Sequence, residues 1–220
     1  MNSEGSQNTV QAFGALRQLT RRQPRRMERC ELCSVALYSE HPHLIEPSQR
    51  RLLCACDACA LLFSGREDAK FKLVPRRVRK LSSFHMSDAD WDGLLIPINL
   101  AYFVRGGADG RMSAMYPSPA GATESLLSLQ TWNSIVQANP VLDELQPDVE
   151  ALLVNRVGHA RGAFPAEYYI APIDACYCLV GLIRMHWRGL SGGEEVWREI
   201  GNFFTGLRSK AEVVAEEANA

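Results

Sequence analysis

Two closely spaced pairs of cysteines are the part of this sequence best suited to chemistry. Cys30 and Cys33 form one CxxC pair, and Cys56 and Cys59 form a second, with 22 residues between the pairs. Each CxxC turn directs two sulfurs to one side, and a hairpin between the turns brings all four together, as tetrahedral thiolate coordination requires. The spacing therefore predicts a four-thiolate metal site of the zinc-ribbon or rubredoxin-like kind. Buried free thiols and redox disulfide chemistry are the alternatives.

A fifth cysteine in the same region leaves the ligand set open. Cys54 lies two residues before Cys56, so on a strand both side chains point to the same side. Three roles are open for Cys54: it replaces Cys56 as a ligand, it supplies the extra sulfur of an iron–sulfur cluster, or it packs beside the site without binding the metal. We expect zinc, with rubredoxin-like or iron–sulfur iron as the alternative. A mixed site that recruits His41 or His43 is also open, although the sequence His-Pro-His is typical of an exposed loop.

The other candidate residues favour structural roles. Cys176 and Cys178 stand too close for a CxxC pair, which favours buried packing, and a lone helical histidine such as His186 is typical of packing. Segment 117–125 offers hydroxyls before a predicted helix, but it lacks the lysine and glycine spacing of a phosphate-binding loop. No Ser/His/Asp order, HExxH or GxGxxG motif occurs. The sequence therefore favours a non-catalytic protein.

A small β module is needed to position the cysteines, and residues 27–63 have the composition to form it. Segments 35–38 and 51–55 are rich in strand formers, whereas the prolines within 41–43 and 46–48 indicate turns. We therefore predict a metal-binding β-ribbon with a knuckle at each end.

Basic segments flank this module on both sides. Residues 1–26 are predicted to be a flexible basic arm, and residues 64–90 a basic connector in which Pro75 excludes a continuous helix. Residues 17–80 carry 15 Lys and Arg against 7 Asp and Glu, a net charge of +8, whereas residues 81–220 carry 9 against 17, a net charge of −8. We therefore expect the connector to meet an acidic partner surface.

Residues 91–210 are predicted to form a larger mixed α+β domain. The glycines of 106–110 indicate the turn of a β-hairpin. Asp174 is expected to cap a helix, and residues 211–220 to be a frayed tail. Apolar patterning predicts a further strand at 168–173 and helices that start near 126, 175 and 194. Segment 149–154 fits a helix or a strand, and we favour the strand. The fold class is thus α+β, with a small zinc-ribbon or rubredoxin-like module before a mixed domain.

Length and composition indicate a globular protein. At 220 residues and 46% hydrophobic content, the chain is long enough to bury a substantial core. Its apolar runs fall short of the roughly 20 residues of a membrane-spanning helix, and no secretory signal is recognisable. We expect a cytoplasmic protein, and in a reducing compartment paired cysteines are more often metal ligands than disulfides.

Several motifs together resemble a known bacterial family. They are Cys30-Glu31-Leu32-Cys33, the stretch from Leu52 to Phe63, Tyr116-Pro117-Ser118-Pro119-Ala120-Gly121-Ala122-Thr123-Glu124-Ser125, Pro172-Ile173-Asp174-Ala175-Cys176-Tyr177 and Trp187-Arg188-Gly189-Leu190-Ser191-Gly192-Gly193. The resemblance spans roughly residues 28–208 and is to an uncharacterised family encoded beside high-affinity nickel–iron hydrogenases. It implies an accessory role in assembling, stabilising or delivering electrons to such a hydrogenase.

Three functions are therefore expected from the sequence. The first is a metal-binding accessory protein that contacts a hydrogenase subunit or maturation protein. The alternative is a rubredoxin-like iron protein that transfers electrons for the same hydrogenase. The third is a zinc-ribbon protein that binds nucleic acid, which the acidic C-terminal part disfavours because it would repel the phosphate backbone.

Overall fold

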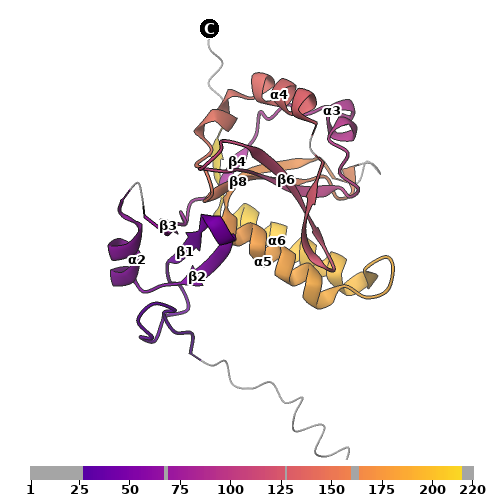
Figure 1. Cartoon of the computed structure of the whole chain (residues 1–220). Coiled ribbons are helices and arrows are strands. Elements are labelled where there is room, and N and C mark those ends of the chain that lie inside the picture. Colours follow the sequence, from indigo (N-terminus) through magenta and orange to yellow (C-terminus); the bar gives the residue numbers. More distant parts are fainter. Residues whose placement is uncertain (1–26, 67–68, 127, 160–163, 215–220) are drawn as a thin grey trace, which may run out of the picture.

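The computed structural model describes residues 27–66, 69–126, 128–159 and 164–214 (Figure 1). These residues form two β-sheets with helices beside them, which confirms the predicted α+β class. The smaller sheet belongs to the part of the chain that contains the cysteine pairs, and the larger sheet to the remainder. The predicted N-terminal arm, residues 1–26, lies outside the described residues.

A hairpin, a short third strand and one helix make up the small module. β1 (His43–Glu46) and β2 (Arg51–Cys54) pair antiparallel and are joined by the 3-10 turn η1 (Pro47–Gln49). β3 (Lys72–Leu73) pairs with the other edge of β1. α2 (Asp57–Ser64) follows β2 after two residues. The module has its own small core, formed by Cys30, Leu44, Ala55, Cys59 and Ala60.

The hairpin uses a different first strand from the one predicted. The strand at 51–54 is confirmed, but the expected strand at 35–38 is replaced by a single bridge between Arg29 and Ala36. Val35 is half exposed and Tyr38 is almost fully exposed, so this segment has no apolar face to bury. β1 buries Leu44 and Ile45 instead, and burial of one face is what stabilises a short strand.

The predicted connector, residues 64–90, is part of both sheets. It contains β3 of the small sheet, β4 (Arg79–Leu81) of the large sheet and the start of α3 (Asp88–Gly93). Pro75 lies between the two strands, where it interrupts no ladder. Val74 and Val78 are buried among the basic residues of this segment, which explains why it packs as structure instead of crossing the surface as a linker.

Seven strands form the large sheet, in the order β10-β4-β9-β8-β5-β6-β7. Only the β10–β4 pair is parallel, and the other described pairs are antiparallel. The predicted frayed tail is corrected at its start, because β10 pairs with β4 and the Glu212 N–H donates to the Val78 carbonyl. The remaining strands are β5 (Leu100–Arg105), β6 (Met112–Ser118), β7 (Gly121–Ser125), β8 (Glu150–Asn155), β9 (Glu167–Pro172) and β10 (Glu212–Val214).

Helices cover both faces of this sheet, so the body of the molecule has three layers (Figure 1). Alternate residues of β5 show the arrangement: Leu100 and Tyr102 face one core, and Ala101 and Phe103 face the other. The first core is completed by α5 (Ile173–His186) and α6 (Gly193–Lys210), and the second by α3, α4 (Leu129–Ala138) and η2 (Pro140–Glu144). No described helix combines the length and the apolar character needed to cross a bilayer.

Most predicted elements of the large domain are present, with two differences. The hairpin around 106–110 and the strands β8 and β9 lie where expected. Segment 117–125, however, is the tight β6–β7 hairpin, because Gly121 adopts a φ of 125° that permits the reversal. Asp174 lies within the first turn of α5, whose N-cap is Pro172, so the side chain is free to contact the small module instead of capping the helix.

Candidate metal centre

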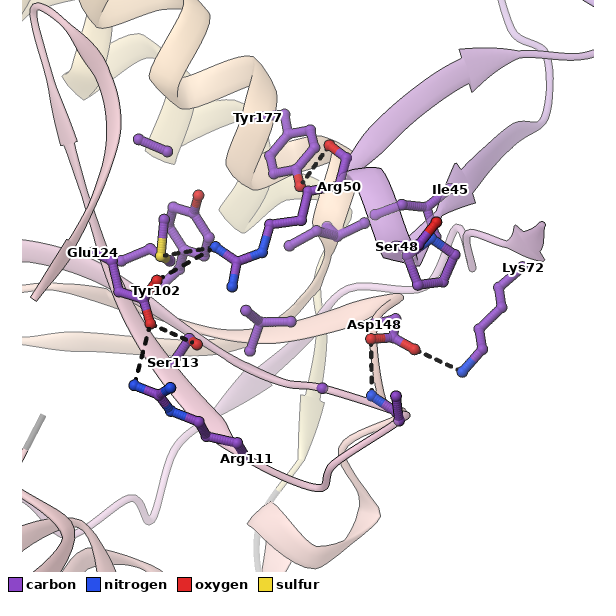
Figure 2. A pocket seen from close by; sticks show the side chains of 18 of the residues that line it. Ile45, Ser48, Arg50, Lys72, Tyr102, Arg111, Ser113, Glu124, Asp148 and Tyr177 are labelled. Atoms are coloured by element: carbon purple, nitrogen blue, oxygen red, sulfur yellow. Dashed lines mark hydrogen bonds and ion pairs between the residues drawn. The ribbon is translucent and has the colours of Figure 1, made fainter. Parts of the chain in front are cut away.

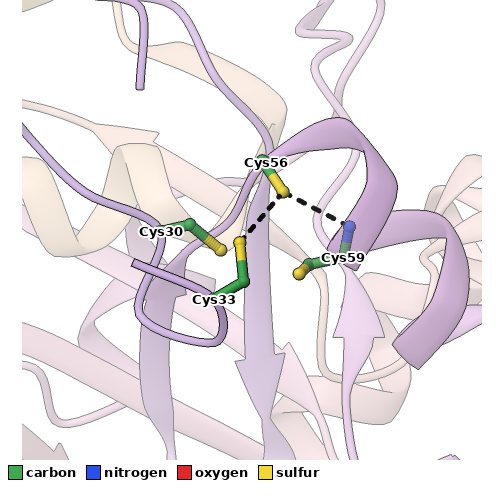
Figure 3. Close-up of side chains that lie close together, drawn as sticks. All are labelled: Cys30, Cys33, Cys56 and Cys59. Atoms are coloured by element: carbon green, nitrogen blue, oxygen red, sulfur yellow. Dashed lines mark hydrogen bonds between the residues drawn. The ribbon is translucent and has the colours of Figure 1, made fainter. Parts of the chain in front are cut away.

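The first cysteine pair lies in a tight knuckle held by backbone hydrogen bonds. The Ser34 N–H donates to the Cys30 carbonyl at 2.7 Å, and the Cys30 N–H donates to the Val35 carbonyl at 2.8 Å. Ser34 has a φ of 65°, the left-handed conformation that turns the chain back after Cys33. These contacts curl the loop so that both thiols face the same side, as the CxxC spacing predicts (Figure 3).

The second pair is positioned by the start of α2. Cys56 is the N-cap residue of this helix, and its Sγ accepts a hydrogen bond from the Cys59 N–H at 3.5 Å. Cys59 lies in the first turn and is buried. The Ala55 N–H donates to the Pro42 carbonyl at 2.9 Å, which fixes the chain between β2 and the helix. A sulfur thus replaces the hydroxyl or carboxylate that usually caps a helix.

All four sulfurs converge on one point. The Sγ atoms of the two pairs lie within 4.8 Å of one another, and those of Cys33 and Cys56 are 3.7 Å apart (Figure 3). A tetrahedral ion with Zn–S bonds of about 2.3 Å separates its sulfurs by about 3.8 Å. Cys30 and Cys59 are buried, whereas Cys33 is exposed. The cluster can therefore hold one metal ion close to the surface of the module.

The electrostatics of the cluster suit a cation. Burial raises the pKa of the Cys30 thiol, but backbone hydrogen bonds, above all from Cys56 and Cys33, outweigh it and lower that pKa to about 6. Burial raises the pKa of Cys59 to about 12, and the neighbouring sulfurs add to the rise. The Cys30 thiolate therefore forms readily, and its negative charge opposes the deprotonation of Cys59. A bound divalent cation removes this conflict because it favours the thiolate form of every ligand.

Cys54 is not among the four converging sulfurs. β2 ends at Cys54 and Cys56 begins the helix, so the strand alternation that would turn both thiols to one side stops between them. The Cys54 backbone is pinned by Glu31, which donates its N–H to the Cys54 carbonyl and accepts the Cys54 N–H through Oε1, each at 2.9 Å. The Cys54 thiol lies instead with the imidazoles of His41 and His43.

The other residues considered from the sequence have ordinary surroundings. Cys176 is fully buried in α5 within the first core, and burial raises its pKa, whereas Cys178 on the same helix is exposed. His186 pairs through Nδ1 with Glu195 at 2.9 Å. Ser118 accepts and donates hydrogen bonds inside the β6–β7 hairpin, so segment 117–125 presents no helix N-terminus to an anion.

Sequence reasoning missed a cavity of about 1070 Å³ between the small module and the large sheet. Figure 2 shows Arg50 reaching from the η1–β2 corner toward Glu124 of β7, with their atoms 3.6 Å apart. Arg111 approaches the same carboxylate at 3.8 Å, and the Tyr177 hydroxyl donates to the Arg50 carbonyl at 3.3 Å. These residues come from distant parts of the sequence, so no local motif predicts the cavity.

Comparison with known proteins adds one relationship. No curated protein and no solved structure matches the chain. A model of a family of unknown function, DUF5947, matches residues 29–211, which include both cysteine pairs and the whole of the large sheet as far as the start of β10. The chain belongs to this family.

Proposed function

We propose that the chain is a zinc-binding accessory protein of a nickel–iron hydrogenase, which it helps to assemble or stabilise through protein–protein contacts. The observation that carries the metal-binding part is the convergence of the sulfurs of Cys30, Cys33, Cys56 and Cys59 within 4.8 Å. The identity of the partner comes from the sequence resemblance to the hydrogenase-associated family.

Zinc is the metal that best fits a structural role here. Four thiolates in tetrahedral positions form a closed site with no place for a substrate, which is typical of structural zinc. The small module has few apolar residues in its core, so a metal crosslink would contribute much of its stability. A rubredoxin-like iron would use the same four ligands, and it remains the alternative that metal analysis separates from zinc.

An exposed apolar surface on the module supports docking. Leu61 and Leu62 of α2 are 76% and 75% exposed, and Phe63 is 46% exposed. The exposed Leu73 lies on β3, which packs beside α2. We call these four residues the α2 patch. Several large apolar side chains exposed on one short helix and the strand beside it support a site for another protein.

Charge supports docking less than the sequence suggests. Lys72 pairs with Asp148 at 2.7 Å, and Lys80 pairs with Glu167 at 3.4 Å, so much of the basic connector is neutralised within the molecule. The same pairing weakens the nucleic-acid alternative, which needs basic residues free to contact phosphates. We therefore assign the contact with the partner to the apolar α2 patch.

Metal analysis of the full-length protein tests the first part of the proposal. Protein purified without added metal should be colourless and contain zinc, and Cys30→Ser should lower the zinc content by about one equivalent. Cys178→Ser, which removes an exposed thiol on α5, should leave the content unchanged. A red or brown protein that contains iron would favour the rubredoxin-like alternative over zinc. An unchanged metal content in Cys30→Ser would overturn the proposed site.

Affinity capture tests the second part. A tagged full-length chain, expressed at its native level in its own host, should retain hydrogenase subunits identified by mass spectrometry. Cys30→Ser should retain fewer of them because the module that carries the α2 patch loses its crosslink. Capture that recovers no hydrogenase subunit from cells that produce the enzyme would overturn the assignment of the partner.

A further inference from the structure

A second group of metal-ligating side chains lies beside the four-thiolate cluster. His41, His43 and Cys54 each offer one ligand atom, and these three atoms lie within 4.8 Å of one another. His43 and Cys54 are directly opposite in the β1–β2 pair, which places both side chains on one face. The imidazole rings of His41 and His43 meet edge to face, with their centroids 4.9 Å apart.

The hydrogen bonds of both histidines leave the same ring nitrogen available. His41 Nδ1 lies 2.9 Å from the Tyr38 carbonyl, which only accepts, so Nδ1 carries the proton and Nε2 has a free lone pair. His43 Nδ1 lies 2.7 Å from Oδ2 of Asp174, which likewise accepts. Histidines that bind metals usually donate their other N–H to a carbonyl or a carboxylate in this way.

Asp174 is itself well held. Its second oxygen, Oδ1, accepts the N–H of Ala175 at 2.7 Å in the first turn of α5. The carboxylate thus fixes both the orientation and the tautomer of His43 from the large domain. This arrangement is the carboxylate–histidine pair found behind metal ligands.

The free nitrogen of His41 has no partner in the part of the chain that the structure describes. The His41 side chain is only 7% exposed, and its Nε2 is buried without a hydrogen bond. Buried polar atoms in folded proteins almost always have a partner, because an unpaired one costs free energy. A metal ion bound between the two imidazoles and the thiol would satisfy this atom.

We propose that His41, His43 and Cys54 form a second metal site, separate from the four-thiolate cluster, for one divalent transition-metal ion of the zinc class. Imidazole and thiolate are the ligands that zinc prefers. The Cys54 thiol loses its proton to solvent as the metal binds. Three protein ligands leave the fourth tetrahedral position open to water or to a donor from another molecule, which the closed four-thiolate site does not offer.

The second site lies where the small module meets the large domain. His43 lies in β1 of the small module, whereas Asp174 lies at the start of α5 in the large domain. The ligands of this metal would therefore belong to the small module, whereas the carboxylate that orients His43 belongs to the large domain. The inference does not rest on the proposed function, because neither zinc in the first site nor a hydrogenase partner is needed for it.

Zinc titration of the full-length protein tests the proposal. The wild-type chain, loaded with excess Zn²⁺ and dialysed, should retain about two equivalents, and His41→Ala and Cys54→Ser should each retain about one. His186→Ala and Cys178→Ser are matched controls that remove a histidine and a thiol elsewhere, and both should retain two. Wild-type protein with one equivalent, or His41→Ala with as much zinc as the wild type, would overturn the second site.

Cobalt provides a measurement that a folding defect does not imitate. His41→Ala leaves every thiol in place, so Co²⁺-loaded His41→Ala should keep the thiolate-to-cobalt absorption of the four-thiolate site and lose only the contribution of the second ion. Cys30→Ser should show the reverse, losing the first contribution and keeping the second. Spectra in which Cys54→Ser and Cys30→Ser lose the same band would place Cys54 in the first site and contradict the proposal.

Discussion

Arg79 lies inside the molecule with its Nη2 3.8 Å from a carboxylate oxygen of Glu150, and Glu150 is only 1% exposed. Arg79 comes from β4 and Glu150 from β8, so the pair spans β9, which lies between them. The same guanidinium also hydrogen-bonds the more exposed Glu144 through Nη1. Charges at this depth are stable only when they are paired, so this contact sets the position of β4 in the sheet.

Replacing Arg79 should therefore be strongly destabilising. Arg79→Met keeps an apolar stem but leaves the Glu150 carboxylate buried without a cation, and we expect the free energy of unfolding to fall by about 3–5 kcal/mol. Urea denaturation at neutral pH measures the change. Arg77→Met, two residues away and exposed, should change it by less than about 0.5 kcal/mol. Equal effects of the two substitutions would contradict the structural role of the buried pair.

Glu167 should make the stability of the fold depend on acid pH. Burial raises the pKa of Glu167. The Arg208 guanidinium at 2.9 Å, the Tyr169 hydroxyl at 3.0 Å and the charge of Lys80 lower that pKa by more than burial raises it, so the net pKa lies below its ordinary value of 4.5. A lowered pKa in the folded state stabilises the fold above the unfolded pKa and loses that contribution as pH falls through the folded pKa.

The variant Glu167→Gln tests this dependence. It should be less stable than the wild type at neutral pH, and its free energy of unfolding should fall less steeply below pH 4.5, because the group that takes up a proton is gone. Denaturant unfolding at several pH values between neutral and acid measures both slopes. Parallel curves for the two proteins would show that Glu167 contributes nothing to the acid sensitivity.

The sequence predicted what local geometry determines. A CxxC turn brings its own two sulfurs together, so Cys30 with Cys33, and Cys56 with Cys59, could be paired from spacing alone. The strand β9 was also predictable, since a continuous apolar run buried on both faces is visible in the sequence. The run that forms β8 fitted a helix as well, so the sequence only favoured a strand there. The helix-terminal position of Asp174 was also predicted, although its actual partner was not.

Contacts between distant residues could not be predicted in this way. The positive charge of the connector was visible, but the carboxylate that neutralises Lys72 lies 76 residues further along the chain. His43 and Asp174 are 131 residues apart, so nothing in the local sequence His-Pro-His indicated a carboxylate behind the imidazole. Segment 35–38 shows that composition alone can also mislead. Its residues favour a strand, but the segment has no apolar face to bury and forms only a single bridge.

Removing metal should loosen the small module and leave the large sheet intact. The knuckles at 29–36 and 55–60 depend on few apolar contacts, whereas β5 and β8 are buried on both sides in their own cores. After treatment with a strong chelator, amide hydrogen exchange should become faster in the two knuckles and stay slow in β5 and β8. Unchanged exchange in the knuckles would mean that metal does not hold them, and loss of protection throughout would mean that the two parts unfold together.

The α2 patch should matter for partner binding and not for folding. Leu61→Ser combined with Leu62→Ser replaces two exposed side chains, so the free energy of unfolding should change by less than about 0.5 kcal/mol. If a hydrogenase is the partner, as proposed, retention of its subunits in affinity capture should fall by about tenfold or more, because apolar anchors at the centre of an interface carry much of its affinity. Leu190→Ser, fully exposed between α5 and α6, is the matched control and should leave retention unchanged. Equal retention by the double variant and by Leu190→Ser would rule out the α2 patch as the docking surface for the proposed partner.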